Sequence, residues 1–446
     1  MLCRCEMNIL SGKRFTIHIQ GCRTNQYEGE AIAAALEAEG AVRGEGSPDI
    51  VIIVSCTITA VADRKCRKLV RRARRENPRA VVALCGCYVQ KMTDAEMELL
   101  EIDIAVGNRL KYRLPRLIAE RLNGAAPLSA VERGIETDAS WDGLRLDRPR
   151  LHTRAFLKVQ DGCNHYCSYC IVPLVRGRPV SRPLEEAVEE ARRVTESGCP
   201  EIVLTGVHLG LYEELPLLVR RIGALPLLRR LRFGSIEPFA VNEELLAALA
   251  ETPSFCEHLH MPLQSGDDGV LAAMRRGYDS AAFAKIAERA RARLGDSLHI
   301  STDLMTAFPC EDAAAFKRSL KFVEELGFGK LHVFPYSPRE GTEAARMKRL
   351  PDSAARERTA EALELAERLH RKFCSRWIGD EVTILAEEKK NGVARGLTRN
   401  YIRVTAQAEA KINEELRLIP TAYRDGGLTT EGLEAESSFD VDISVI

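Results

Sequence analysis

The sequence has no feature that marks a membrane or exported protein. Its longest apolar run, near residues 80–89, is well short of the roughly 18 residues that a membrane-spanning helix needs. The opening residues, MLCRCEMNIL, contain no clear signal peptide. The net charge is zero, with 64 basic and 64 acidic residues, so the overall charge favours no class of partner. We therefore expect a cytoplasmic protein without a membrane partner.

Clustered cysteines are the unusual feature that is present. Fourteen cysteines are too few to staple a chain of 446 residues by disulfides, and they are too clustered to be only core residues. In the absence of an export signal, such clusters indicate metal or redox chemistry. The length allows about three domains, at roughly 150 residues each.

The first part of the chain, residues 12–125, alternates short apolar runs with helical patterns. The expected strands are residues 15–20, 50–55, 80–85 and 103–106, and the expected helices are residues 28–40 and 60–77. This order predicts a parallel α/β domain. From residue 113 to residue 150 the sequence is rich in proline, glycine and charge, which predicts a linker.

A longer α/β series covers residues 149–374. Its expected strands are residues 156–159, 201–204, 231–235, 257–260, 298–304 and 330–334, with helical stretches between them. Six successive strand–helix units predict a partial or complete β/α barrel, with an open doubly wound sheet as the alternative. Residues 377–446 predict a small β domain with strands near 381–387 and 400–404.

Three cysteines, Cys163, Cys167 and Cys170, lie in a CxxxCxxC pattern directly after the first expected barrel strand. Three thiolates can hold three irons of a [4Fe–4S] cluster and leave the fourth iron free for S-adenosylmethionine. This spacing is the radical-SAM signature, and the carboxyl end of a strand is where a β/α barrel keeps its active site. The alternative is a zinc site that has His165 or a distant residue as its fourth ligand.

Polar segments follow the later barrel strands and predict a binding face. From these segments we expect Gly206, Glu237 and Gln264 to contact the cofactor, together with Tyr169, the aromatic residue before the last cysteine of the CxxxCxxC loop. Glycine allows close approach of the backbone, and the Glu237 and Gln264 side chains can hydrogen-bond ribose or methionine groups.

A second cysteine group follows the strands of the first domain. Cys22, Cys56 and Cys87 each come directly after an expected strand. Because the carboxyl ends of adjacent parallel strands lie side by side, the three should converge there. Cys85 competes with Cys87, but it lies within an apolar run and is expected to be a buried core thiol. The arrangement predicts a second [4Fe–4S] cluster, with three unrelated core cysteines as the alternative.

The sequence resembles the methylthiotransferases, radical-SAM enzymes with two such clusters, over nearly its whole length. The resemblance rests on GCRTNQYEGE at Gly21, CTITAVADRKCRK at Cys56, GCYVQ at Gly86, QDGCNHYCSYCIVPLVRGR at Gln160, LTGVHLG at Leu204, HLHMPLQSGDD at His258 and FPYSPREGT at Phe334. NQYE, CTIT and TGVHLG are similar to the branch that modifies N6-threonylcarbamoyladenosine. The branches that modify isopentenyladenosine in tRNA or a ribosomal protein remain alternatives, as does a zinc-containing RNA-binding module without catalysis.

The resemblance implies a reaction and its partners, and at one loop this sequence differs from the family pattern. It implies methylthiolation of C2 of threonylcarbamoyladenosine at position 37 in the tRNA anticodon loop, an electron donor such as flavodoxin or ferredoxin, and a C-terminal TRAM domain, a small RNA-binding β-barrel. Where the family usually has GFPGE, this chain has Ala307 and Cys310 in place of the glycines. If the backbone there needs a positive φ, a side chain would strain it.

Basic residues indicate where RNA would bind. The expected helix at residues 60–77 has an apolar face and a basic face suited to phosphates. We expect RNA contacts from Arg64, Lys65, Arg67, Lys68, Arg71, Arg72, Arg176 and Arg178, with Arg395 and Arg399 as further candidates. A solvated helix face is the alternative.

Overall fold

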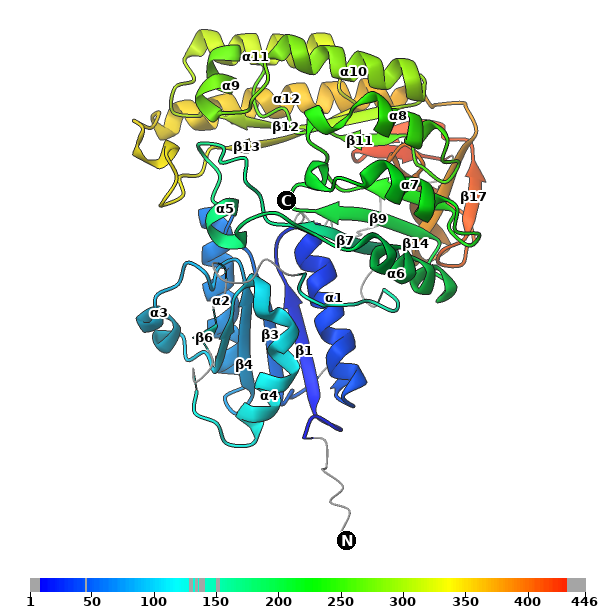
Figure 1. Ribbon diagram of the computed structural model, residues 1–446. Coiled ribbons are helices and arrows are strands. Elements are labelled where there is room, and N and C mark those ends of the chain that lie inside the picture. The colour runs from blue at the N-terminus through cyan, green and yellow to red at the C-terminus, as the bar shows by residue number, and fades with distance from the viewer. Residues whose placement is uncertain are drawn as a thin grey trace.

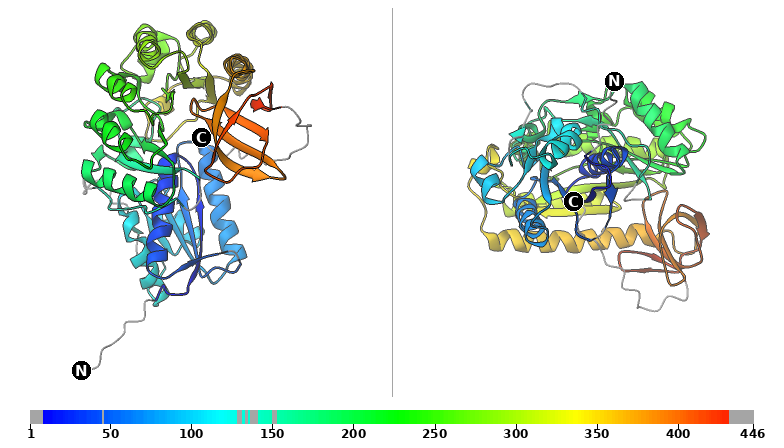
Figure 2. Two further views of the ribbon diagram at one scale, coloured as in Figure 1. Left: turned by 90° about the vertical axis from the view of Figure 1, so that its right-hand side faces the viewer. Right: turned by 90° about the horizontal axis from the view of Figure 1, so that it is seen from below.

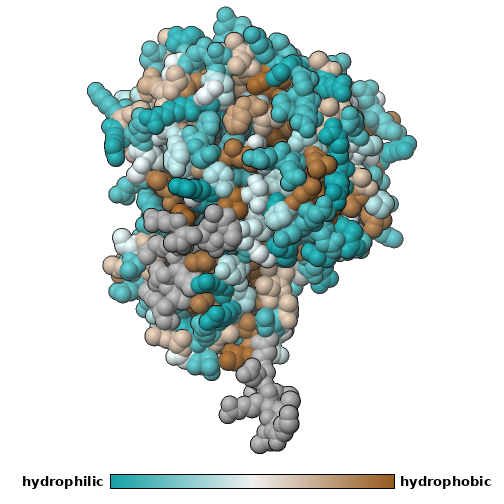
Figure 3. Space-filling model, viewed as in Figure 1, coloured by the Kyte–Doolittle hydropathy of each residue, from teal (hydrophilic) through white to brown (hydrophobic). Residues whose placement is uncertain are grey.

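The computed structural model describes residues 9–44, 46–127, 131–132, 135, 141–149 and 153–430. A lower α/β domain supports an upper barrel-like domain, and a small β domain lies against one side of the barrel (Figures 1 and 2). None of the helices in these residues has the length and apolar character to cross a membrane. On the face in Figure 3, hydrophobic residues are scattered among hydrophilic ones.

The N-terminal domain contains a parallel sheet in the order β2-β1-β3-β4-β5-β6. Its strands are β1 (Arg14–Ile19), β2 (Val42–Arg43), β3 (Ile50–Ser55), β4 (Val81–Gly86), β5 (Ile104–Val106) and β6 (Val131–Glu132). Its helices are α1 (Arg23–Ala38), α2 (Ala60–Glu76), α3 (Asp94–Leu99), the 3-10 helix η1 (Asn108–Arg113) and α4 (Leu114–Leu122). β3 and β4 are buried along their whole length, as expected for central parallel strands. The expected parallel sheet is confirmed.

The expected linker at residues 113–150 is wrong in its first part, because α4 occupies it. The helix has Pro115 in its first turn, where the missing N–H costs no hydrogen bond. Leu114, Leu117 and Ile118 bury its apolar side. The proline therefore begins a helix instead of interrupting the regular structure.

The second domain is built from six parallel strands, each followed by a helix that covers the outside. The strands are β7 (Ala155–Asp161), β9 (Glu201–Gly206), β10 (Arg230–Phe233), β11 (His258–His260), β12 (His299–Thr306) and β13 (Lys330–Pro335). The covering helices are α6 (Leu184–Glu196), α7 (Leu215–Gly223), α8 (Glu243–Ala250), α10 (Ser280–Leu294), α11 (Ala313–Leu326) and α12 (Asp352–Ser375). Short elements between them are α5 (Val172–Arg176), β8 (Val180–Ser181), α9 (Asp268–Met274), and the 3-10 helices η2 (Leu209–Leu211), η3 (Pro238–Ala240) and η4 (Ala344–Arg346).

Hydrogen bonding divides these strands into two sheets, β10-β9-β7-β8 and β11-β12-β13. A single bridge between Leu231 and Phe255 joins them, so the strands follow one curved wall in sequence order. The left view in Figure 2 shows the strands inside and the helices outside. The expected β/α arrangement is confirmed.

The C-terminal domain is a mixed sheet in the order β17-β14-β15-β16-β19-β18. Its strands are β14 (Val382–Lys390), β15 (Val393–Thr398), β16 (Arg403–Gln407), β17 (Glu415–Leu418), β18 (Ala422–Arg424) and β19 (Gly427–Thr429). Within residues 377–430 no pairing joins β17 to β18, so a closed TRAM barrel stays a prediction. The residues after 430, including the end of the expected domain, lie outside the described part.

Candidate functional site

The CxxxCxxC loop leaves β7 at its carboxyl end, as expected. Gly162 has φ +73° and no room for a side chain, because a Cβ would lie 2.1 Å from the carbonyl oxygen of Arg178. The Cys163 amide donates to the carbonyl of Gly177 at 3.0 Å, which closes the loop. Cys163, Cys167 and Cys170 are all half-buried. Burial raises the pKa of the Cys163 thiol to about 11 and that of Cys170 to about 12.

His165 lies beside this loop, but its ring is engaged elsewhere. Its Nε2 bonds the carbonyl of Arg276 at 3.2 Å, and its ring stacks on Phe239 at 5.8 Å. A tetrahedral zinc site would also need its sulfurs only about 4 Å apart. Among the described residues, the one trio of possible ligands with atoms within 4.8 Å of each other is Glu28, Asp142 and Asp161, not a cysteine group. The geometry therefore does not favour the zinc reading.

Arg276 organises the groups around Cys167. Its buried guanidinium donates to the Glu237 carboxylate, to Tyr169 Oη at 3.4 Å and to Cys167 Sγ at 3.4 Å. Nearby anionic groups and Tyr169 raise the pKa of Arg276 against the effect of burial. Two of the expected cofactor residues, Tyr169 and Glu237, are thus brought together at the CxxxCxxC loop. Sequence reasoning missed Arg276, because an arginine in a charged stretch carries no sign of which carboxylate it meets.

The other two expected cofactor residues, Gln264 and Gly206, lie just beyond the end of β11 and at the end of β9, on either side of β10. Gln264 has φ +75°, and its buried Oε1 has no hydrogen-bond partner among the described residues. Such an orphaned acceptor fits a polar group of a bound cofactor. Gly206 is packed by Gln160, because a Cβ there would lie 2.9 Å from the Gln160 Cβ. Its role in the fold is close packing of β9 on β7.

Cys22, Cys56 and Cys87 follow β1, β3 and β4, which are neighbours in the sheet. The glycines before two of them allow the close approach: a Cβ on Gly21 would lie 2.9 Å from Cys56 Sγ, and a Cβ on Gly86 would lie 2.7 Å from the Ser55 carbonyl. Burial, followed by the fields of Cys87 and Cys22, raises the pKa of Cys56 to about 12. The three thiols therefore lie within electrostatic reach of one another.

Cys85 is placed differently from Cys87. It is fully buried within β4, among the apolar residues of the main core, and burial raises its pKa to about 12. Cys87 lies at the strand end, where Asn108 Nδ2 donates to its Sγ at 3.4 Å. This placement agrees with the expectation that Cys85 is a core thiol, and the ligand role of Cys87 stays a prediction.

The two cysteine groups adjoin each other. Cys87 packs against Ile171 and Val175, in the segment that follows Cys170. Asn108 also donates to the Val175 carbonyl at 2.6 Å, which fixes α5 on the strand ends of the N-terminal domain. The sheet edge that carries one cysteine group therefore faces the loop that carries the other.

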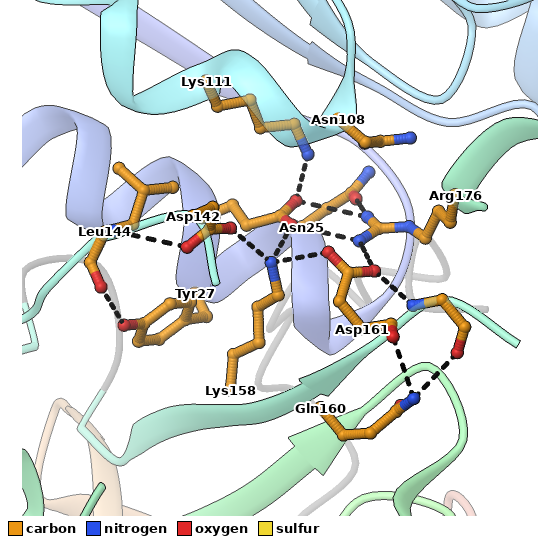
Figure 4. Close-up of polar contacts among 12 residues, drawn as sticks. Asn25, Tyr27, Asn108, Lys111, Asp142, Leu144, Lys158, Gln160, Asp161 and Arg176 are labelled. Atoms are coloured by element: carbon orange, nitrogen blue, oxygen red, sulfur yellow. Dashed lines mark hydrogen bonds and ion pairs between the residues drawn. The ribbon is translucent and has the colours of Figure 1, made fainter. Parts of the chain in front are cut away.

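A buried charge network locks this arrangement (Figure 4). Arg176 Nη1 contacts Glu28 and Asp161 at 3.0 Å each, and Lys158 contacts Glu28 at 2.8 Å and Asp142 at 2.6 Å. Lys111 bonds Glu28 as well. The cations hold the pKa of Glu28 and that of Asp161 well below their usual range, although burial alone would raise both. Three cations balance three carboxylates here, which leaves no net negative charge for a metal ion.

The expectation that Arg176 contacts RNA is wrong. Its side chain is 2% exposed and bonded to Asn25, Glu28 and Asp161. Arg178 is exposed, so its RNA contact stays a prediction. Arg399 donates to the carbonyl oxygens of Pro253 and Phe255, which ties the C-terminal domain to the barrel rather than leaving the side chain free for phosphate.

Helix α2 has the expected two faces. Cys66, Val70 and Ala73 are buried on the sheet. The exposed basic residues are Arg64, Lys65, Lys68, Arg71, Arg72 and Arg75, and Arg75 lies 3.8 Å from Glu76. Arg72 pairs with Glu76 at 2.9 Å, whereas Arg67 is half-buried and bonds Tyr88 Oη. Arg64, Lys65, Lys68 and Arg71 have no ion pair within the described residues.

Comparison with known proteins identifies the family. Residues 157–323 match the radical SAM superfamily, and residues 14–107 match an uncharacterized protein family, UPF0004. The chain is 33% identical over 404 residues to threonylcarbamoyladenosine tRNA methylthiotransferase MtaB of Bacillus subtilis, covering 87% of this chain and 89% of the relative. It is 35% identical over 400 residues to the Thermotoga maritima protein of the same name, covering 88% and 91%.

Other similarities are broader. The tRNA-2-methylthio-N(6)-dimethylallyladenosine synthase of Clavibacter michiganensis is 33% identical over 403 residues, covering 86% of this chain and 75% of the relative. A solved structure of the radical S-adenosylmethionine methyltransferase TsrM from Kitasatospora setae shares the fold, with a TM-score of 0.57, 16% identity and coverage of 75% and 77%. As a radical-SAM protein, the chain uses S-adenosylmethionine and a [4Fe–4S] cluster. The chain belongs to the radical-SAM tRNA methylthiotransferase family.

Proposed function

We propose that this protein transfers a methylthio group to C2 of N6-threonylcarbamoyladenosine at position 37 of tRNA. The names of the MtaB relatives support this substrate, at 33% and 35% identity over most of both chains. The dimethylallyladenosine relative matches at 33% identity, so isopentenyladenosine is the second candidate.

The observation that carries the proposal is the packing of Cys87 against Ile171, the residue next to Cys170. Cys163, Cys167 and Cys170 would hold one [4Fe–4S] cluster, and Cys22, Cys56 and Cys87 would hold a second. A cluster with an open iron supplies one-electron chemistry at S-adenosylmethionine, which can open an aromatic C–H bond that no ordinary base opens. Because the two cysteine groups adjoin each other, the target base would bind between the two clusters.

The chain's own residues would position the cofactor and the RNA. Arg276 fixes the orientation of Glu237 and Tyr169 beside Cys167, and the Gln264 Oε1 is available to accept a hydrogen bond. The exposed cations of α2 and Arg178 would contact phosphates of the anticodon stem-loop, with a TRAM-like C-terminal domain adding RNA contacts. An electron donor such as flavodoxin or ferredoxin would reduce the cofactor cluster, and the reaction would take place in the cytoplasm.

The test is mass spectrometry of tRNA nucleosides from a deletion strain. Loss of the 2-methylthio form of threonylcarbamoyladenosine, restored by the intact gene, is the expected result. Loss of the isopentenyl product instead, or of a methylthio group on a ribosomal protein, would reassign the substrate. Iron and sulfide analysis after anaerobic reconstitution separates the enzyme from a zinc-containing RNA-binding module, which would hold zinc and no sulfide.

A further inference from the structure

Arg23 crosses from the N-terminal domain into the barrel. It follows Cys22 directly and is the first residue of α1. Its Nη1 donates to the carbonyl of Phe233, the last residue of β10, at 3.4 Å, and its Nη2 donates to Tyr401 Oη at 3.3 Å. The guanidinium therefore lies inside the barrel, between the last residue of β10 and Tyr401, whose ring stacks on His258, the first residue of β11.

Arg23 differs from the other arginines inside the barrel in having no carboxylate partner among the described residues. Arg232 pairs with Glu201 at 2.9 Å, Arg154 pairs with both Glu387 and Glu201, and Arg276 pairs with a carboxylate as well. Both contacts of Arg23 are to neutral oxygens. A half-buried guanidinium between neutral partners retains donors and a full positive charge for an anionic ligand.

A tyrosine from the C-terminal domain holds this guanidinium in place. The Tyr401 ring stacks on His258 at 4.6 Å, and the guanidinium carbons of Arg23 and Arg232 lie 6.0 and 5.1 Å from its centroid. Tyr401 is packed among groups of the barrel, so Arg23 is anchored at its phenol end rather than free to swing out. A fixed guanidinium loses little entropy when it binds a planar carboxylate.

We propose that Arg23 binds the carboxylate of the threonylcarbamoyl group and so selects this substrate from other N6-substituted adenosines. The inference rests on the function proposed above. In adenine, ring nitrogen N1 lies between C6, which carries the substituent, and C2, which receives the methylthio group. A substituent folded along this edge, with its urea N–H donating to N1, carries its carboxylate toward C2. A cation beside Cys22 is therefore where that carboxylate would arrive.

The experiment compares two anticodon stem-loop RNAs. One carries threonylcarbamoyladenosine, and the other carries its neutral methyl ester. Wild-type protein should prefer the acid by about 10- to 100-fold in kcat/KM, the range for a charge-assisted pair. In the R23Q variant the ratio of kcat/KM for the acid to that for the ester should fall to about 1, and R23K should keep most of the preference. Fluorescence anisotropy should show the same pattern in Kd without S-adenosylmethionine.

Matched controls separate the outcomes. R116Q removes an exposed arginine of α4 that pairs with Glu120, and this variant should keep the wild-type preference. Equal losses on both RNAs in R23Q, or a wild-type enzyme that does not distinguish acid from ester, would overturn the role of Arg23 and leave the proposed function standing. Wild-type activity on isopentenyladenosine RNA alone would overturn both.

Discussion

Arg176 donates a hydrogen bond of 2.6 Å to the side-chain oxygen of Asn25, and this contact joins the segment after Cys170 to the helix after Cys22. The same guanidinium neutralises Glu28 and Asp161. A single buried cation thus connects the two cysteine groups, and the spacing between them depends on charges that no solvent screens.

Replacing Arg176 by methionine should destabilise the protein strongly. The change keeps much of the apolar volume but leaves Glu28 and Asp161 short of one cation, which costs about 3–5 kcal/mol for a broken buried pair. Urea unfolding followed by circular dichroism measures it. Because the two cysteine groups would lose their fixed spacing, formation of the methylthio product should fall more than cleavage of S-adenosylmethionine.

Arg178→Met is the matched control. Arg178 is exposed and two positions away, so its loss should change the free energy of unfolding by no more than about 0.5 kcal/mol. If the two variants were equally stable, the network would not be what holds the domains together.

The six cysteines give a second prediction. Alanine at Cys22, Cys56, Cys87, Cys163, Cys167 or Cys170 should abolish the methylthio product. Removing one whole triad should leave about four of eight irons, because the other cluster remains. Iron and sulfide analysis with electron paramagnetic resonance measures this. Cys85→Ala should keep both clusters, since Cys85 lies in the core of the sheet. Full activity in Cys87→Ala together with loss in Cys85→Ala would show that the third ligand had been assigned wrongly.

The sequence was sufficient for the features that have a short-range signal. Strand periodicity located the parallel sheet and the six barrel strands, and the rule for parallel strand ends brought Cys22, Cys56 and Cys87 to one edge. It failed where the answer depends on long-range charge pairing. Arg176 looked like a phosphate ligand, because nothing local indicates that Glu28 folds against it.

The C-terminal domain was predicted less completely for a different reason. Asn391 and Gly392, a residue pair that favours tight hairpin turns, both have positive φ and connect β14 to β15. Strands as short as β18 and β19 have too few alternating residues to show a pattern. Tyr401, which has φ +67° and enters the barrel, has no sequence signal at all.

The basic face of α2 gives a third prediction, on RNA affinity. The double variant Lys65→Ala/Lys68→Ala should weaken binding of the tRNA and reduce the dependence of log Kd on log salt by about 1.5, for two lost phosphate contacts. Filter binding at several salt concentrations measures both. The control is Arg220→Ala. It removes an arginine of α7 that is paired with Glu251, and it should leave the salt dependence unchanged. An unchanged slope in the double variant would mean that this helix face is only solvated.

Ala307 gives a fourth prediction, because it stands where the family has glycine. Its φ is +59°, and its amide donates to the Glu311 carboxylate at 2.8 Å. A side chain in this left-handed region costs about 1 kcal/mol, so Ala307→Gly should raise the free energy of unfolding by roughly that amount. Cys310 has no positive φ, and Cys310→Gly should bring no gain. Equal effects of the two glycines would contradict this explanation, and urea unfolding distinguishes them.

The pH dependence of stability gives the last prediction, and it depends on His299 at the base of the barrel. Its Nδ1 bonds the Asn400 carbonyl at 2.8 Å and its ring stacks on Phe373 at 4.4 Å, and burial lowers its pKa to about 3. In the unfolded chain a histidine binds a proton below about pH 6.5, whereas His299 in the folded protein does not. The unfolded state therefore binds more protons between about pH 6.5 and pH 3, and stability must fall as the pH is lowered through this range.

For one such group the free energy of unfolding changes by at most about 1.4 kcal/mol per pH unit. Burial also lowers the pKa of His332 to about 4, so His332 adds to the loss of stability between about pH 6.5 and pH 4. In His299→Gln the side-chain amide can still donate to Asn400, but the titrating group is gone. Urea unfolding at about pH 7, 6 and 5 should therefore show a shallower loss of stability in the variant than in the wild type. Parallel pH profiles would mean that His299 is protonated in the folded protein, and that the base of the barrel admits water.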